Sequence, residues 1–227
     1  SQFGLVPMEN STDGRITDTL NMFARTPMRI CGEVQLRVHH NLLACCDRAS
    51  VTDVYSKPQA LSQCRNWLAQ HLPQAALHET TSTTAAAELA AKTPGAAAVA
   101  SRQAGVNYGL DVVAANIEDN KNNVTRFAVI GHDAQPRTRN DKTALMFQVE
   151  HKPGALADAM TLFKRSRLNL TWIESFPIPG VASEYLFFIE LEGHELDTRV
   201  KRAIEALAKK AVRLEILGSY AKTEIVD

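Results

Sequence analysis

Residues 117–127 read IEDNKNNVTRF, and the interpretation of the rest of the chain depends on this polar segment. It contains two acidic residues, several side-chain amides, a hydroxyl and an arginine, and it leads into the apolar residues 127–130. Asn and Asp are favoured in turns, so a surface loop that leads into a strand is one interpretation. Ordering so many polar groups is costly unless they bind something, and the remaining sequence favours this second interpretation.

The composition excludes several classes of partner. The 227 residues contain 25 Lys and Arg and 25 Asp and Glu, so no overall charge favours nucleic acid or an anionic membrane surface. No apolar run approaches the ~18 residues of a membrane span, and no signal-peptide pattern begins the sequence. We therefore expect a cytoplasmic protein that holds any anionic ligand at a local site.

The cysteines and histidines do not form a pattern typical of a metal site. Cys31, Cys45, Cys46 and Cys64 contain no CxxC pair, and we expect reduced thiols or small core residues. On a strand, the neighbours His39 and His40 face opposite sides, which disfavours a shared metal. We expect neither a metal nor an organic cofactor.

Short strands and helices alternate through the first part of the chain, which predicts an α/β lobe. The pattern predicts strands at residues 3–7, 28–43, 51–55, 75–79, 96–100, 112–115 and 127–130, and helices at 16–23, 60–72, 85–91 and 101–108.

The composition changes after residues 134–141, a polar stretch with Pro136 that we interpret as a linker between domains 1–133 and 142–227. Beyond it the pattern predicts strands at residues 143–149, 168–173, 185–191 and 212–217, and helices at 154–163 and 196–208. The order βαββαβ is that of a ferredoxin-like unit.

Five consecutive hydroxyl residues, at 80–84, precede the alanine-rich helix. Ser82 or Thr83 could cap the helix by accepting a hydrogen bond from one of its first free amides. A helix start with free N–H groups beside hydroxyls is also suited to an anion, and both interpretations stay open.

Several motifs, each weak alone, occur in one order across nearly the whole chain. They are VPMENS at 6–11 with Gly14, VYSKPQAL at 54–61 with Gln63 and Cys64, TST at 81–83, YGL at 108–110, IED at 117–119, Asn123, TRF at 125–127, KPGAL at 152–156, and IES at 173–175 with Pro177. In this order they resemble the prephenate dehydratases that carry a C-terminal ACT regulatory domain.

The resemblance implies a two-lobed catalytic domain, like that of periplasmic binding proteins, followed by a ferredoxin-like βαββαβ ACT domain. Family members carry a further N-terminal stretch with a Gly-Pro-x-Gly-Thr-like motif, so we expect that the first lobe is largely missing here. The implied reaction converts prephenate to phenylpyruvate with loss of carbon dioxide and water, without a cofactor. L-Phenylalanine is the implied allosteric effector, and a homodimer or homotetramer is the implied assembly.

The resemblance also assigns roles to residues. Thr125 is the implied catalytic residue, at the leaving hydroxyl of the substrate. The implied substrate-binding residues are Asn10, Ser11, Lys57, Gln59, Ser82, Thr83, Asn123, Arg126 and Phe127. The implied effector-binding residues are Gly154, Ala155, Leu156, Glu174 and Ser175.

Some roles stay open in the sequence. In a regular strand Thr125 and Phe127 share one face and Arg126 points to the other, so Arg126 is either a carboxylate clamp or a structural ion-pair partner. We expect Glu9 to orient its neighbours or to hold backbone amides, since it would repel a dianionic substrate. We expect Asp119 to serve as a turn or cap residue.

Two positions depart from the family pattern. Lys57 stands where the family usually has His, which keeps a cationic donor. Phe176 stands where the effector motif usually has Arg. The resemblance therefore supports feedback by phenylalanine less firmly than it supports catalysis. A non-catalytic two-lobed ligand-binding module with an amino-acid-sensing ACT domain is the alternative function.

Overall fold

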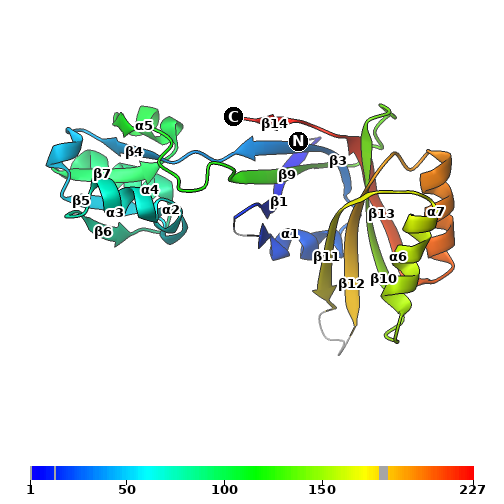
Figure 1. The fold of residues 1–227 in the computed structure, drawn as a ribbon. Coiled ribbons are helices and arrows are strands. Elements are labelled where there is room, and N and C mark those ends of the chain that lie inside the picture. Colours follow the sequence, from blue (N-terminus) through cyan, green and yellow to red (C-terminus); the bar gives the residue numbers. More distant parts are fainter. Residues whose placement is uncertain (1, 13, 179–183) are drawn as a thin grey trace. The chain divides into compact units, whose positions relative to one another are not determined.

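The computed structural model describes residues 2–12, 14–178 and 184–227, and these residues form three β-sheets (Figure 1). The chain divides into two compact units. Unit 1 contains Ser1–Leu36 and Val124–Asp227, and unit 2 contains Arg37–Asn123.

Unit 2 is an α/β lobe built on a five-stranded sheet of order β6-β5-β7-β4-β8. Strand β5 is parallel to β6 and β7, whereas β4 is antiparallel to β7 and β8. The strands are β4 Asn41–Ala44, β5 Asp53–Ser56, β6 Ala76–Glu79, β7 Ala96–Ala100 and β8 Asp111–Ala114; the helices are α2 Pro58–Gln63, α3 Arg65–His71, α4 Thr83–Lys92, α5 Arg102–Tyr108 and the 3-10 turn Arg48–Ser50.

Alanine lets helix and sheet approach closely in this lobe. All five residues of β7 are buried, and Ala98 and Ala100 pack in one apolar cluster with Ala86, Ala87 and Ala90 of α4. Apart from the two elements corrected below, the strands and helices predicted for residues 37–123 are present with ends shifted by a few residues.

The single helix predicted at residues 60–72 is wrong, because the chain forms two helices that break at Cys64. Pro58 occupies the first turn of α2, as expected for a residue that lacks an N–H donor. The Asp119 carboxylate accepts hydrogen bonds from the backbone amides of Asn66 and Trp67 at 2.9 and 3.1 Å, which satisfies the start of α3. The cap role expected for Asp119 is thus confirmed.

The single strand predicted at residues 28–43 is also wrong. Its residues form β3 (Arg29–Arg37) and β4, which belong to two different sheets. Between them, Val38 N donates to Asn123 O at 2.8 Å, and His40 O accepts from Ile117 N at 2.8 Å. The alternation of polar and apolar residues ends at Val38, and three polar residues at 39–41 follow it. The predicted strand runs across this break.

Unit 1 contains a five-stranded sheet of order β14-β3-β9-β1-β2. Its elements are β1 Gly4–Asn10, β2 Gly14–Arg15, β3, β9 Val124–Gly131 and β14 Ile225–Val226, with helix α1 Thr17–Phe23. Strand β1 runs antiparallel to β9, and β14 pairs parallel with Gln35 and Leu36 of β3. The sequence pattern did not predict β14.

The second sheet of unit 1 is four-stranded and antiparallel, of order β11-β12-β10-β13. Its elements are β10 Asp141–Val149, α6 Ala155–Arg165, β11 Leu170–Pro177, β12 Tyr185–Glu192, α7 Thr198–Ala208 and β13 Ala211–Ala221. This confirms the predicted βαββαβ order.

The two faces of the four-stranded sheet contribute to different apolar clusters. Helices α6 and α7 cover one face (Figure 1), where Phe163 and Leu207 pack with Phe147. On the other face Met146 and Phe188 pack with residues of the five-stranded sheet and of α1, including Leu20. A sheet buried on both faces explains why Asp141–Phe147 of β10 are all buried.

The two sheets of unit 1 come into close contact at Gly218 of β13. A Cβ atom at this position would lie 2.1 Å from the backbone oxygen of Ile30 in β3. Since real Cβ atoms do not approach oxygen so closely, only glycine fits without a backbone shift.

We predict that Gly218→Ala lowers the free energy of unfolding by about 1–3 kcal/mol, because the added methyl group overpacks the contact with Ile30. Gly32→Ala in β3 is the matched control, since its Cβ would make only ordinary contacts at 3.6 Å with Val129. Urea unfolding of both variants provides the measurement. Equal stability of the two would contradict the close approach.

Candidate active site

Thr125 lies in a paired position beside Asn10. Strands β1 and β9 place the two residues opposite each other, and Asn10 Nδ2 donates to Thr125 Oγ1 at 2.8 Å. The Asn10 side-chain oxygen accepts from Thr12 N at 2.9 Å, which orients the amide. Because the Thr125 oxygen accepts a hydrogen bond, its own hydrogen is available for donation to another acceptor.

Ser11 joins the same group through the backbone. Ser11 Oγ accepts from Val124 N at 2.9 Å, and Ser11 N donates to Val124 O at 2.9 Å. The structure therefore brings Asn10, Ser11 and Thr125 together at the start of β9, and Phe127 is half-buried two residues further along the strand.

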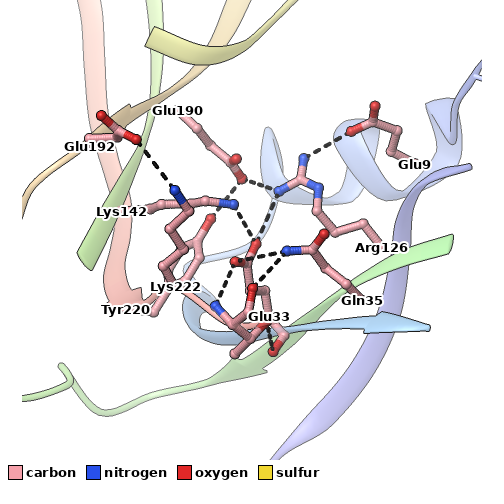
Figure 2. Close-up of polar contacts among 10 residues, drawn as sticks. Glu9, Glu33, Gln35, Arg126, Lys142, Glu190, Glu192, Tyr220 and Lys222 are labelled. Carbon is pink, nitrogen blue, oxygen red and sulfur yellow. Dashed lines mark hydrogen bonds and ion pairs between the residues drawn. The ribbon is translucent and has the colours of Figure 1, made fainter. Parts of the chain in front are cut away.

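Arg126 points away from this group. Strand β9 begins at Val124, so side chains alternate at Thr125 and Arg126. The Arg126 guanidinium contacts the carboxylates of Glu190 and Glu9 (Figure 2). Burial disfavours the charge, but these carboxylates outweigh it and raise the pKa of Arg126 above its ordinary value. Of the two roles left open for Arg126, these contacts are those expected of a structural ion-pair partner, and Glu9 is one of its partners.

Four of the other candidates gather at one edge of the unit 2 sheet. Parallel strands β5 and β6 end at Ser56 and Glu79, which pair with each other, and the following segments lead into α2 and α4. Lys57 and Gln59 therefore lie at the same carboxyl edge as Ser82 and Thr83, where ligands of α/β sheets commonly bind.

Ser82 is the N-cap of α4. Its Oγ accepts a hydrogen bond from Ala85 N at 3.0 Å, which confirms the capping interpretation. Lys57 is exposed and holds the N-cap position of α2, without a capping bond from its side chain.

Asn123 is buried and also lies toward this edge, because it contacts Gln63 at the end of α2. Gln63 in turn contacts His40, which precedes the end of β4 that pairs with Ala100 of β7. Asn123 Nδ2 donates to Gln63 Oε1 at 3.0 Å, and the same oxygen lies 2.7 Å from His40 Nε2. Since a carboxamide oxygen only accepts, His40 must carry hydrogen on Nε2 in this arrangement. Gln63 and His40 were not among the expected site residues.

Glu118 is a second buried group that was not expected. Its two carboxylate oxygens contact His39 Nδ1 at 2.8 Å and His40 N at 2.9 Å. Burial opposes ionisation, but these hydrogen bonds outweigh it and lower the pKa of the Glu118 carboxyl. The adjacent histidines and the acidic pair at 118–119 were visible in the sequence, whereas their pairing depends on the fold.

The expected effector residues fall on two elements, the start of α6 and strand β11. Gly154, with φ of 82°, precedes α6, and a 110 Å³ pocket is lined by Val149, Glu150, His151, Lys152, Ala155, Leu156, Glu184, Tyr185 and Phe187. Glu174 and Ser175 lie on β11, where Ser175 pairs with Phe187. Phe176 is buried in the apolar cluster between α1 and the two sheets of unit 1.

Within the described part of the chain, the cysteines are free thiols, and no cluster of three or more His, Cys, Asp or Glu side chains could hold a metal ion. Burial raises the pKa of the Cys64 thiol to about 12, and Glu118 and Asp119 add to this effect. No helix described here is both long and apolar enough to cross a membrane.

Comparison with protein families finds that residues 1–135 match the model of prephenate dehydratase. The chain belongs to the prephenate dehydratase family. A bifunctional chorismate mutase/prephenate dehydratase of Aquifex aeolicus is 41% identical over 98% of this chain and 62% of its own length. The chain thus spans about three fifths of the length of the first curated relatives that it matches.

Two solved structures resemble this member of the prephenate dehydratase family closely. The prephenate dehydratase of Arthrobacter aurescens in complex with L-Phe has a TM-score of 0.88 and 32% identity, over 98% of this chain and 76% of that one. GqqA, described as a novel type of quorum quenching acylase, has a TM-score of 0.89 and 28% identity, over 98% and 83% of the two chains.

We predict that Glu118→Gln destabilises the protein near neutral pH and that the difference from wild type shrinks in acid. The folded-state pKa of Glu118 is lowered, so its carboxylate stabilises the fold above the ordinary glutamate pKa of ~4.3. This stabilisation is lost as the pH falls through the folded pKa. Urea unfolding of both proteins between neutral and acidic pH measures the difference, and a pH-independent difference would contradict the assignment.

Proposed function

We propose that the protein is a cytoplasmic prephenate dehydratase, which converts prephenate to phenylpyruvate with loss of carbon dioxide and water. The hydrogen-bonded pair of Asn10 and Thr125 is the observation that carries this proposal. Membership of the family and the TRF motif at 125–127 support it.

The reaction needs a hydrogen-bond donor at the leaving hydroxyl. As the bond to the ring carboxylate breaks, its electron pair enters the ring, which becomes aromatic as hydroxide is expelled and protonated to water. A threonine hydroxyl is a weak acid, so we assign Thr125 as a donor to the departing oxygen. Asn10 fixes the Thr125 oxygen, and a positioned donor of this kind typically contributes ~2.7–4 kcal/mol.

The substrate is a dianion, and the carboxyl edge of the unit 2 sheet offers groups suited to a carboxylate. Ser82 and Thr83 lie at the start of α4, a ten-residue helix whose first amides favour anions. Lys57 adds a cationic donor and Gln59 a neutral one. We therefore keep these residues, with Ser11, as candidate substrate ligands. Arg126 is better assigned to a structural role, since it contacts Glu9 and Glu190.

We further infer that residues 1–133 belong to a two-lobed catalytic domain, that 134–141 form a linker, and that 142–227 form an ACT regulatory domain that binds L-phenylalanine. The βαββαβ order and the pocket at Ala155 and Leu156 support the regulatory assignment. The Arthrobacter relative, whose structure holds L-Phe, supports the choice of effector. We expect the protein to assemble as a homodimer or homotetramer.

We predict that Thr125→Ala lowers kcat about 10²–10³-fold in the protein expressed from its own gene, because one donor to the leaving group is lost. Thr125→Ser retains the hydroxyl and is the matched control, with kcat within a few-fold of wild type. Phenylpyruvate absorbance during incubation with prephenate measures the rate. A folded wild-type protein that forms no phenylpyruvate would overturn the function in favour of a non-catalytic binding module, and near-wild-type turnover by Thr125→Ala would overturn the assignment of Thr125.

We predict that L-phenylalanine binds the protein and lowers its turnover of prephenate. Isothermal calorimetry with L-phenylalanine, and with D-phenylalanine as the stereochemical control, measures the binding. Absence of heat and of thermal stabilisation at saturating L-phenylalanine would contradict the effector assignment.

A further inference from the structure

A cluster of charged side chains joins the two sheets of unit 1 directly behind Thr125. Figure 2 shows Arg126 of β9 and Glu33 of β3 facing Glu190, Lys142 and Tyr220 of the four-stranded sheet. Arg126 Nη1 donates to Glu190 Oε1, and Tyr220 Oη donates to the same oxygen at 2.6 Å. Lys142 Nζ donates to Glu33 Oε2 at 2.8 Å.

The cluster is buried and balanced in charge. Glu33, Glu190 and Lys142 are each less than one tenth exposed, and Tyr220 is 1% exposed. The carboxylates of Glu33 and Glu190 are matched by the cations of Arg126 and Lys142. Burial, followed by the neighbouring Glu190, raises the pKa of Tyr220 well above its ordinary value, so its hydroxyl stays a donor. Loss of one charged member would leave an uncompensated buried charge, which favours fixed positions for the charged side chains.

The position of Arg126 matters because of a register shift in the adjoining strands. Pro7 pairs with Phe127 and Glu9 with Arg126, so Met8 is an extra residue between the two pairs. Such a bulge interrupts the ladder and redirects the side chains beside it. The last two pairs, Glu9 with Arg126 and Asn10 with Thr125, therefore depend on local contacts to keep their register.

Arg126 supplies those contacts on both sides. Its Nη2 donates to Glu9 Oε2 at 3.2 Å within the five-stranded sheet, and its Nη1 donates to Glu190 in the four-stranded sheet. The guanidinium also lies 5.1 Å from the ring centre of Trp172 on β11. Thr125, which carries the candidate donor hydroxyl, is thus next in sequence to Arg126, whose guanidinium contacts Trp172 of β11 and Glu190 of β12.

We propose that Glu190 is a positioning residue for the reaction: it holds Arg126, and through Arg126 it fixes the place of the Thr125 hydroxyl. The four-stranded sheet then controls turnover at Thr125 through this contact. The inference rests on the proposed function, because it concerns the same donor hydroxyl.

Replacement of Glu190 by glutamine tests the proposal, since the amide keeps the shape of the side chain and removes its charge. We expect kcat to fall about 10–100-fold with little change in KM, as misplacement of a catalytic group lowers turnover without removing substrate contacts. Glu192→Gln is the matched control on the same strand, where Glu192 forms an ion pair with the exposed Lys222 at 3.4 Å (Figure 2). The control should keep wild-type kcat.

A spectroscopic readout separates positioning from stability. The methyl resonance of Thr125, observed by NMR in the folded protein, should shift in Glu190→Gln and stay unchanged in Glu192→Gln. If Glu190→Gln does not fold, Tyr220→Phe replaces it, because it keeps the charge balance and removes only the second hydrogen bond to Glu190. It should produce a smaller change in kcat and in the methyl resonance.

The outcomes distinguish this inference from the proposed function. Suppose that wild type forms phenylpyruvate and that Thr125→Ala loses activity. If the folded Glu190 or Tyr220 variant then keeps wild-type kcat and an unchanged methyl resonance, the positioning role is overturned and the function stands. If wild type forms no phenylpyruvate, the function itself fails. The methyl resonance still reports in that case whether Glu190 places Thr125.

Discussion

The ion pair between Arg126 and Glu190 is the interaction on which the arrangement of unit 1 depends. It connects a strand of the sheet that carries Thr125 to a strand of the βαββαβ sheet, and both side chains are withdrawn from solvent. A buried pair of this kind contributes little net stability compared with apolar packing, but breaking it is costly. The ion pair therefore specifies the relative position of the two sheets of unit 1. The surrounding apolar cluster supplies most of the stabilisation.

Strand alternation gives this ion pair its chemical importance. Thr125 and Arg126 are adjacent and must point to opposite faces, so one residue can serve the reaction while the next anchors the strand. Asn10 and Glu9 repeat the division on β1, since Asn10 contacts the Thr125 hydroxyl and Glu9 contacts the Arg126 guanidinium. On both strands, the residue assigned to the reaction is therefore next in sequence to a residue that holds the sheets together.

Local chemistry in the sequence predicted the features that depend on neighbouring residues. The alternation at Thr125 and Arg126, the cap at Ser82 and the βαββαβ order are all of this kind. The features that were missed join distant parts of the chain. Glu33 and Lys142 lie 109 residues apart, and Asn123 reaches Gln63 across 60 residues. Hydrophobic periodicity also does not show which sheet a strand joins, so the placement of β3 and β4 in different sheets and the pairing of β14 with β3 were not foreseen.

The account joins catalysis at Thr125 to the contact at Glu190, and a double-mutant cycle tests that connection most directly. The measurement is kcat for prephenate in wild type, Thr125→Ala, Glu190→Gln and the double variant. If Glu190 acts by placing the Thr125 hydroxyl, its replacement lowers kcat in wild type but has no further effect once the hydroxyl is absent. The same fold reduction in both backgrounds would contradict the account.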